Sequence, residues 1–275
     1  MKRVTILFAF ISTVVSATAQ ITYEDDSLKR FSYFLQGYND STGSITQGTG
    51  FILSNDGNNL LVTAKHVLTG CRFNGSKNHA VPDEMLLYYN EDSSLKSQYY
   101  ALNLKTVKDT SACIEYYLSP DIISYPVNDS AFAALSPIDQ FLPAHLPRKR
   151  GKIVFFGFPS YNNIDSGLYF IKPAIKSEIR NYRLYETFSF QNGDGSSVTD
   201  SINYTIKPAD SLIVSHLKGY SGSPVFIRDD ETMQWLFLGV LIAIDEKNNL
   251  LSIVKPGNIL GKLSSTDNGK NQGIP

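Results

Sequence analysis

The chain has 275 residues, of which 42% are hydrophobic and 19% are charged, so its composition is that of a globular protein rather than a disordered or collagen-like one. Its 25 basic residues nearly balance its 26 acidic ones, which argues against nucleic-acid binding, since that needs a surplus of Lys and Arg. Two cysteines are too few for a disulfide scaffold or a Cys-rich zinc site.

The first 19 residues have the pattern of a secretory signal peptide. Lys2-Arg3 gives a positive start, Val4–Ala17 is almost entirely apolar, and Ala17-Thr18-Ala19 supplies small residues around a cleavage position. An uncleaved membrane anchor is the alternative, but the apolar run is shorter than the roughly 20 residues that span a bilayer. We therefore expect cleavage after Ala19, export to the periplasm or the exterior, and no stable membrane anchor afterwards.

The remainder favours short antiparallel strands separated by turns rich in Asn, Asp, Gly, Ser and Pro. The sequence Asn55-Asp56-Gly57-Asn58-Asn59 predicts a hairpin, because Gly and Asn tolerate positive φ. No long stretch keeps a helical apolar period, so one or two barrels or a sandwich are expected. The expected strands are Gly50–Ser54, Leu60–His66, Met85–Tyr89, Tyr99–Val107, Ala112–Leu118, Ala131–Leu135, Lys152–Phe158, Leu168–Ile171, Tyr182–Phe190, Ile202–Ile206, Leu212–Ser215, Pro224–Ile227, Trp235–Ile244 and Leu250–Val254.

A connector divides the chain into two strand-rich halves. Residues 137–152 contain three prolines and the basic cluster Arg148-Lys149-Arg150, and proline removes a donor that a central strand needs. We expect one β-domain over residues 20–136 and a second over 153–263. Residues 264–275 are polar and predict a flexible tail.

Three short segments carry the residues suited to chemistry. His66 closes a predicted strand, Asp129 precedes another, and Ser221 lies in the glycine-flanked turn Gly219-Tyr220-Ser221-Gly222-Ser223-Pro224. Serine attacks a carbonyl well only when an imidazole accepts its proton, and a carboxylate then orients the imidazole. Glycines beside the serine let backbone N–H groups point at the place where an oxyanion develops.

These segments resemble those of the trypsin-like (chymotrypsin-fold) serine peptidases of the bacterial secreted type. Thr-Ala-Lys-His-Val around His66 is similar to their Thr-Ala-Ala-His, and the Ser221 turn is similar to Gly-Asp-Ser-Gly-Gly-Pro. Asn-Asp-Ser-Ala-Phe around Asp129 is similar to their Asp-Ile-Ala-Leu segment. Gly48-Thr49-Gly50-Phe51 and Gly157-Phe158-Pro159 match two further segments, and the order His, Asp, Ser is also that of the family.

The resemblance implies an all-β fold of two antiparallel six-stranded β-barrels with the active site in the cleft between them. It makes Ser221 the nucleophile, His66 the general base and Asp129 the orienting carboxylate, with the amides of Gly219 and Ser221 as the oxyanion hole. It implies a secreted serine endopeptidase that acts on protein or peptide substrates. No cofactor is expected, and no metal, because neither His-Glu-x-x-His nor Cys-x-x-Cys occurs.

Several alternatives stay open at this point. Asp121-Ile122-Ile123 also fits the family's aspartate segment, although the small residue two places after Asp129 favours Asp129. Tyr220 stands where many animal members carry an Asp that pairs with a new N-terminus, so we expect the loop to form without that switch. The same residue leaves room for a binding module without turnover, and an esterase with the same triad is a third possibility.

Substrate preference and the cysteines have weaker signals. Ser215 lies where a trypsin-type pocket carries an Asp, so a strict preference for Lys or Arg is not expected. His216 nearby would suit an acidic side chain or would simply lie on a surface loop. Cys71 and Cys113 either pair in an oxidising compartment or stay as separate buried thiols.

Overall fold

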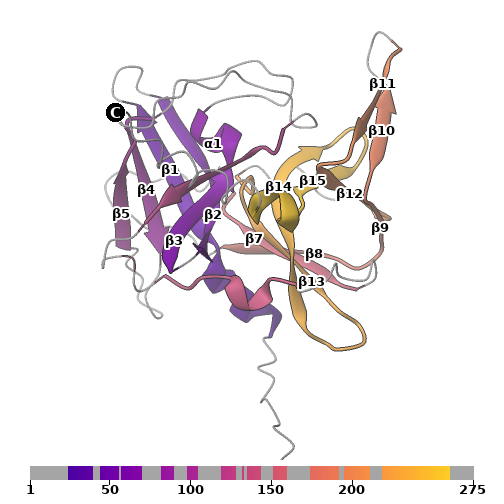
Figure 1. Cartoon of the computed structure of the whole chain (residues 1–275), viewed down its shortest axis with the longest axis horizontal. Coiled ribbons are helices and arrows are strands. Elements are labelled where there is room, and N and C mark those ends of the chain that lie inside the picture. Colours follow the sequence, from indigo (N-terminus) through magenta and orange to yellow (C-terminus); the bar gives the residue numbers. More distant parts are fainter. Residues whose placement is uncertain are drawn as a thin grey trace, which may run out of the picture.

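A computed structural model describes residues 24–39, 44–55, 57–69, 82–89, 98–104, 119–127, 132, 135–143, 151–159, 174–191, 195–210 and 219–260. Within these ranges the chain is mostly β-structure, as expected, and forms two curled sheets that pack side by side (Figure 1). No helix among the described residues is long and apolar enough to cross a membrane.

The first sheet has the six strands expected of one barrel, all paired antiparallel. Its order is β5-β4-β1-β2-β3-β6. The predicted hairpin joins β2 to β3, where Asn55 pairs with Asn58 and Gly57 takes a φ of 80°. The strands are β1 (Tyr33–Asn39), β2 (Ser44–Asn55), β3 (Asn58–Ala64), β4 (Glu84–Tyr89), β5 (Gln98–Asn103) and β6 (Ile122–Pro126).

The second sheet has seven described strands where six were expected, in the order β8-β7-β13-β14-β15-β12-β9. A separate hairpin of β10 and β11 extends beyond it (Figure 1). These strands are β7 (Ile153–Gly157), β8 (Ile175–Ile179), β9 (Tyr182–Tyr185), β10 (Phe188–Gln191), β11 (Ser197–Asp200), β12 (Asn203–Pro208), β13 (Pro224–Arg228), β14 (Trp235–Asp245) and β15 (Leu250–Val254).

Three expected strands differ most from those observed, and four observed strands, β1, β6, β8 and β11, were not expected. The strand expected at Leu60–His66 ends at Ala64, and His66 lies in the helical turn α1 (Lys65–Thr69). Of Ala131–Leu135 only Phe132 and Leu135 are described; neither lies in a strand, and the Leu135 amide donates to the Phe132 carbonyl at 3.0 Å. The one expected at Tyr182–Phe190 is divided into β9 and β10. Ala112–Leu118, Leu168–Ile171 and Leu212–Ser215 lie outside the described residues.

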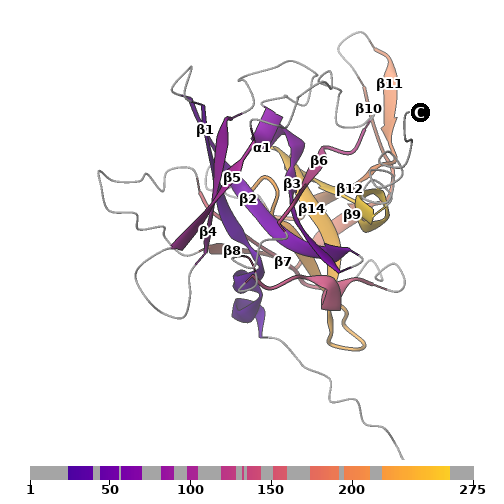
Figure 2. The same cartoon turned by 60° about the vertical axis from the view of Figure 1, so that its left-hand side comes forward.

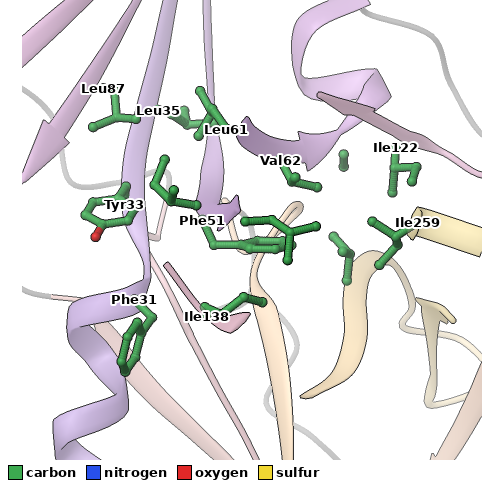
Figure 3. Close-up of a cluster of buried hydrophobic side chains, with 14 of the residues drawn as sticks. Phe31, Tyr33, Leu35, Phe51, Leu61, Val62, Leu87, Ile122, Ile138 and Ile259 are labelled. Carbon is green, nitrogen blue, oxygen red and sulfur yellow. The ribbon is translucent and has the colours of Figure 1, made fainter. Parts of the chain in front are cut away.

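One hydrophobic core joins the two sheets, and Figure 3 shows part of it. Phe51 of β2 contacts Phe237 of β14, with ring centroids 5.5 Å apart. Strand β7 explains how both faces of the second sheet are covered. Val154 and Phe156 belong to the joint core, whereas Ile153 and Phe155 belong to the core of the second sheet alone. Because side chains alternate along a strand, a strand buried on both faces is a continuous apolar run, as Ile-Val-Phe-Phe is.

Two short 3₁₀ helices of the described residues pack against this joint core. They are η1 (Asp25–Phe31) and η3 (Asp139–Phe141), the latter inside the expected connector. Phe31 of η1 is fully buried and meets Phe141 edge to face, with centroids 5.0 Å apart. At the other end of η1, Asp25 forms an ion pair with Lys152 at the start of the second sheet. The N-terminal segment therefore fastens to the second sheet before the chain enters the first. The proposed limits of the two domains remain predictions.

Candidate active site

His66 is held by Asp121, the residue just before the neighbouring strand β6. Strand β6 pairs with β3 so that Ala64 lies opposite Ile122, which places Asp121 beside Lys65 and His66. The Lys65 amide donates to the Asp121 carbonyl at 3.1 Å, and the His66 amide donates to Asp121 Oδ1 at 3.1 Å. The other carboxylate oxygen lies 2.6 Å from His66 Nδ1. Figure 2 shows α1 and β6 together at the end of β3.

This contact decides the state of the imidazole. A carboxylate only accepts, so Nδ1 must carry a proton, and Nε2 of the neutral ring is left as an acceptor. The His66 and Asp121 side chains are 20% and 10% exposed, so both members of the pair are largely shielded from solvent. An imidazole in this state is ready to accept a proton at Nε2.

The preference for Asp129 as the partner of His66 is therefore corrected. The carboxylate at His66 Nδ1 belongs to Asp121, and Asp129 lies outside the described residues. The reason is the pairing of β3 with β6, which fixes the residue just before β6 next to the residues just after β3. The local sequence around the two aspartates does not show which of them this register places beside His66.

The serine turn packs on the strands that lead to His66. Gly219 and Gly222 have φ values of 96° and 91°, which glycine adopts readily and other residues do not. A Cβ atom on Gly222 would lie 1.9 Å from the carbonyl oxygen of Thr49 and 2.3 Å from Thr63 Oγ1. Glycine is thus required there because the turn approaches β2 and β3 closely. This contact places Ser221, which is partly exposed, near the end of β3.

Hydrogen bonds fix the backbone of the turn from both sheets. Thr49 of β2 donates from its amide to the Ser221 carbonyl and from its hydroxyl to the Gly219 carbonyl, each at 2.9 Å. The Gly222 amide donates to Leu241 of β14 at 2.8 Å. Among the described residues, no acceptor receives the amide of Gly219 or of Ser221. These two N–H groups are the pair that the sequence suggested for an oxyanion.

Tyr220 supports the turn from within the second sheet. It is 1% exposed, its hydroxyl donates to the Ile175 carbonyl at 3.0 Å, and its ring meets Phe155 edge to face. A Cβ atom on Gly157 would lie 2.3 Å from the Tyr220 ring. The glycine of the Gly157-Phe158-Pro159 motif therefore makes room for this tyrosine. An aromatic contact of Tyr220 thus supports the turn, as expected for a loop that forms without the ion pair to a new N-terminus.

The remaining predicted residues of the site belong to stretches outside the described residues. Ser215 and His216 lie in residues 211–218, and Cys71 and Cys113 lie in other stretches, all outside the described residues. Within the described part of the chain, no three His, Cys, Asp or Glu side chains gather as metal ligands. Sequence reasoning missed Thr49, whose only signal is its place in the Gly48-Thr49-Gly50 segment.

Comparisons with solved structures identify the fold. One described as GrC is 11% identical and has a TM-score of 0.51, over 90% of this chain and 97% of the other. The Rv3671c protease of M. tuberculosis in its active form is 19% identical, with a TM-score of 0.49 over 91% and 86% of the two chains. A thermostable serine protease, AL20, from an extremophilic microorganism is 12% identical, with a TM-score of 0.49 over 86% and 97%.

The fold is chymotrypsin-like. No protein-family model matches the chain, and no curated protein does. At these identities the comparisons show the fold alone.

Proposed function

We propose that this protein is an exported serine endopeptidase that cleaves protein or peptide substrates through an acyl-enzyme. The observation that carries the proposal is the contact of 2.6 Å between His66 Nδ1 and Asp121, in a fold that brings the Ser221 turn against the strands leading to His66. Ser221 is the nucleophile, His66 the base and Asp121 the orienting carboxylate.

The reaction follows from these positions. As Ser221 Oγ bonds to the substrate carbonyl carbon, its proton passes to His66 Nε2, and Asp121 stabilises the imidazolium. The carbonyl oxygen gains the negative charge and accepts hydrogen bonds from the Gly219 and Ser221 amides. His66 then protonates the leaving amine, and the acyl group stays on Ser221. A water molecule then gives a proton to His66 and bonds to the acyl carbon. The bond from that carbon to Ser221 Oγ breaks, His66 returns the proton to Oγ, and the acid product leaves.

A covalent label tests the nucleophile. A fluorophosphonate should modify the wild-type protein, and mass spectrometry should map the adduct to Ser221. Ser221→Ala should lose labelling, and its kcat for peptide hydrolysis should fall by ~10⁶-fold. Its free energy of unfolding should change by only about 1 kcal/mol, because one partly exposed hydroxyl is lost. Hydrolysis by Ser221→Ala near the wild-type rate would contradict the mechanism.

Substrate class is tested by comparing two reactions of the wild type. A chromogenic ester should give an initial burst, and a protein substrate should be cut at internal bonds. Turnover of the ester alone would favour an esterase, and neither label nor turnover would favour a binding module.

Export is the part of the proposal that depends on residues 1–19. Their charge and apolar pattern support removal by a signal peptidase. N-terminal sequencing of the protein recovered outside the cytoplasm should begin at Gln20. Recovery with Met1 retained would contradict cleavage.

A further inference from the structure

The three carbonyl groups of the serine turn are each held by a different donor. The Gly219 carbonyl accepts from the Thr49 hydroxyl, the Tyr220 carbonyl from the Ser223 amide, and the Ser221 carbonyl from the Thr49 amide, each at 2.9 Å. A trans peptide points its N–H away from its C=O. Holding the Tyr220 carbonyl therefore sets the direction of the Ser221 N–H.

The Gly219 carbonyl belongs to the peptide that joins Gly219 to Tyr220, and this peptide lies between the Gly219 and Ser221 amides. Gly219 has a φ of 96° and no side chain, so its backbone can rotate more freely than that of any other residue type. Among the described residues, the side-chain donor that limits this rotation is the Thr49 hydroxyl, which donates to the Gly219 carbonyl. That single bond therefore restricts the backbone between the two amides that would face the oxyanion.

The position of Thr49 is itself tightly constrained by its surroundings. Thr49 is fully buried on β2, where it pairs with Phe34 of β1, and its own carbonyl accepts the Thr63 hydroxyl at 2.7 Å. A β-branched side chain has few χ1 choices, so a fixed backbone also fixes the hydroxyl. Thr49 belongs to the first sheet, whereas the turn leads into β13 of the second. The bond thus crosses from one barrel to the other.

We propose that Thr49 is a positioning residue for the oxyanion hole, and that its hydroxyl couples the first barrel to the geometry of the serine turn. The catalytic part of this proposal rests on the proposed function. Thr49 does not touch the substrate; it acts through the Gly219 carbonyl. Its loss should leave substrate binding nearly unchanged and slow the chemical step.

Isosteric and conservative variants separate the hydroxyl from the packing. Thr49→Val keeps the shape and removes the donor, whereas Thr49→Ser keeps the donor. We expect Thr49→Val to lower kcat by about 10-fold or more with KM within about 3-fold, because a misdirected oxyanion donor weakens only the transition state. Thr49→Ser should stay near wild type. Thr199→Val, which removes an exposed hydroxyl bonded to Ser189 on the distant hairpin, is the matched control.

A second readout does not depend on turnover. Hydrogen exchange should be faster in the peptide that contains Gly222 and Ser223 in Thr49→Val, and unchanged in Thr49→Ser and Thr199→Val. Thermal melting verifies that each variant is folded, and Thr49→Ala replaces Thr49→Val if the valine disturbs packing.

The outcomes are distinct from those that test the proposed function. Unchanged kcat in Thr49→Val, in a protein whose wild type turns over, would overturn the catalytic role, and unchanged exchange would overturn the structural one. If the wild type neither labels nor turns over, the proposed function fails, and exchange alone decides whether Thr49 positions the turn.

Discussion

At the scale of single residues, the carboxylate beside His66 gives the sharpest prediction. Asp121→Asn would place an amide at Nδ1 and favour the wrong tautomer, so kcat/KM should fall by about 10⁴-fold while the fold is kept. The free energy of unfolding of this variant should change far less than its activity. Steady-state kinetics with a peptide substrate measure the first quantity, and urea unfolding measures the second.

Asp129→Asn is the matched control for this variant. Because His66 Nδ1 is already bonded to Asp121, the Asp129 variant should keep activity close to wild type. A large loss in Asp129→Asn, with Asp121→Asn active, would contradict the geometry described above.

A second residue-scale prediction concerns the hydroxyl of Ser223. It is fully buried, and within the described residues it has no hydrogen-bond partner. A buried hydroxyl without a partner loses hydration and gains nothing in return, so Ser223→Ala should raise the free energy of unfolding by up to about 1 kcal/mol. Thermal or urea unfolding checks this. A loss of more than about 1 kcal/mol would mean that the hydroxyl is satisfied in the folded protein.

At the scale of elements, β7 and the serine turn meet through Gly157 and Tyr220. Gly157→Ala would push a methyl group into the Tyr220 ring, which is wedged against Phe155 and cannot move freely. We expect a loss of about 1–3 kcal/mol in unfolding free energy, as for other overpacked sites, together with lower activity.

Gly257→Ala provides the comparison, because a Cβ atom there would meet no other atom within 4 Å. Residues 256–260 form a short helical turn, in which alanine is preferred to glycine, so stability should be equal or slightly higher. Equal changes in unfolding free energy for the two substitutions would contradict this prediction, because they would mean that the Tyr220 ring moves aside at little cost.

The docking of η1 on the second sheet predicts a pH dependence. Burial raises the pKa of the Asp25 carboxyl, but the hydrogen bond and charge of Lys152, with the charges of Lys176 and Arg228, hold the pKa below its ordinary value of 3.8. A lowered carboxyl pKa means that the folded state favours the charged form. The stability that Asp25 contributes is therefore present above pH 3.8 and is lost as the pH falls through the pKa of the folded state.

Asp25→Asn should accordingly be less stable than wild type at neutral pH, by about 1 kcal/mol or less, since the pair is partly solvated. The difference should shrink in acid below pH 3.8. Melting curves at several pH values measure it. Asp26→Asn is the control, because Asp26 is 74% exposed in its contact with Lys176 and should show a smaller effect. If the difference in stability between wild type and Asp25→Asn grew in acid, the predicted direction of the pH dependence would be wrong.

At the scale of the whole molecule, the joint core controls how the barrels sit against each other. Phe226 of β13 is fully buried and meets Phe141 of the connector, with centroids 5.2 Å apart, and Phe237 of β14 at 6.4 Å. Phe226→Ala should lower the free energy of unfolding by about 3–5 kcal/mol. Activity should fall even where the variant stays folded, because His66 and Ser221 come from opposite sheets.

Phe190→Ala tests whether that loss reflects the joint core rather than any aromatic residue. Phe190 lies on the separate hairpin, is only partly buried and belongs to neither core. Phe190→Ala should lower the free energy of unfolding by much less than Phe226→Ala does. Equal losses in the two variants would contradict the central place of Phe226.

Much of this protein follows from its sequence alone. Local sequence patterns predict the β-rich fold, the hairpin at Gly57 and the serine turn. Strands depend on the alternation of side chains between two faces, and turns depend on the φ preferences of single residues. His66 was singled out in the same way. Strand β8, with the sequence Ile-Lys-Ser-Glu-Ile, was missed because nothing in it differs from a polar loop.

Tertiary structure alone decided which residues meet. Asp121 and His66 are 55 positions apart, and their contact exists because β6 pairs with β3 in one register. A shift of that register by one residue would turn each side chain to the other face, and no local pattern around either aspartate reports the register. The bond from Thr49 to Gly219 spans 170 positions and two barrels, so it too depends on long-range packing that the sequence does not display.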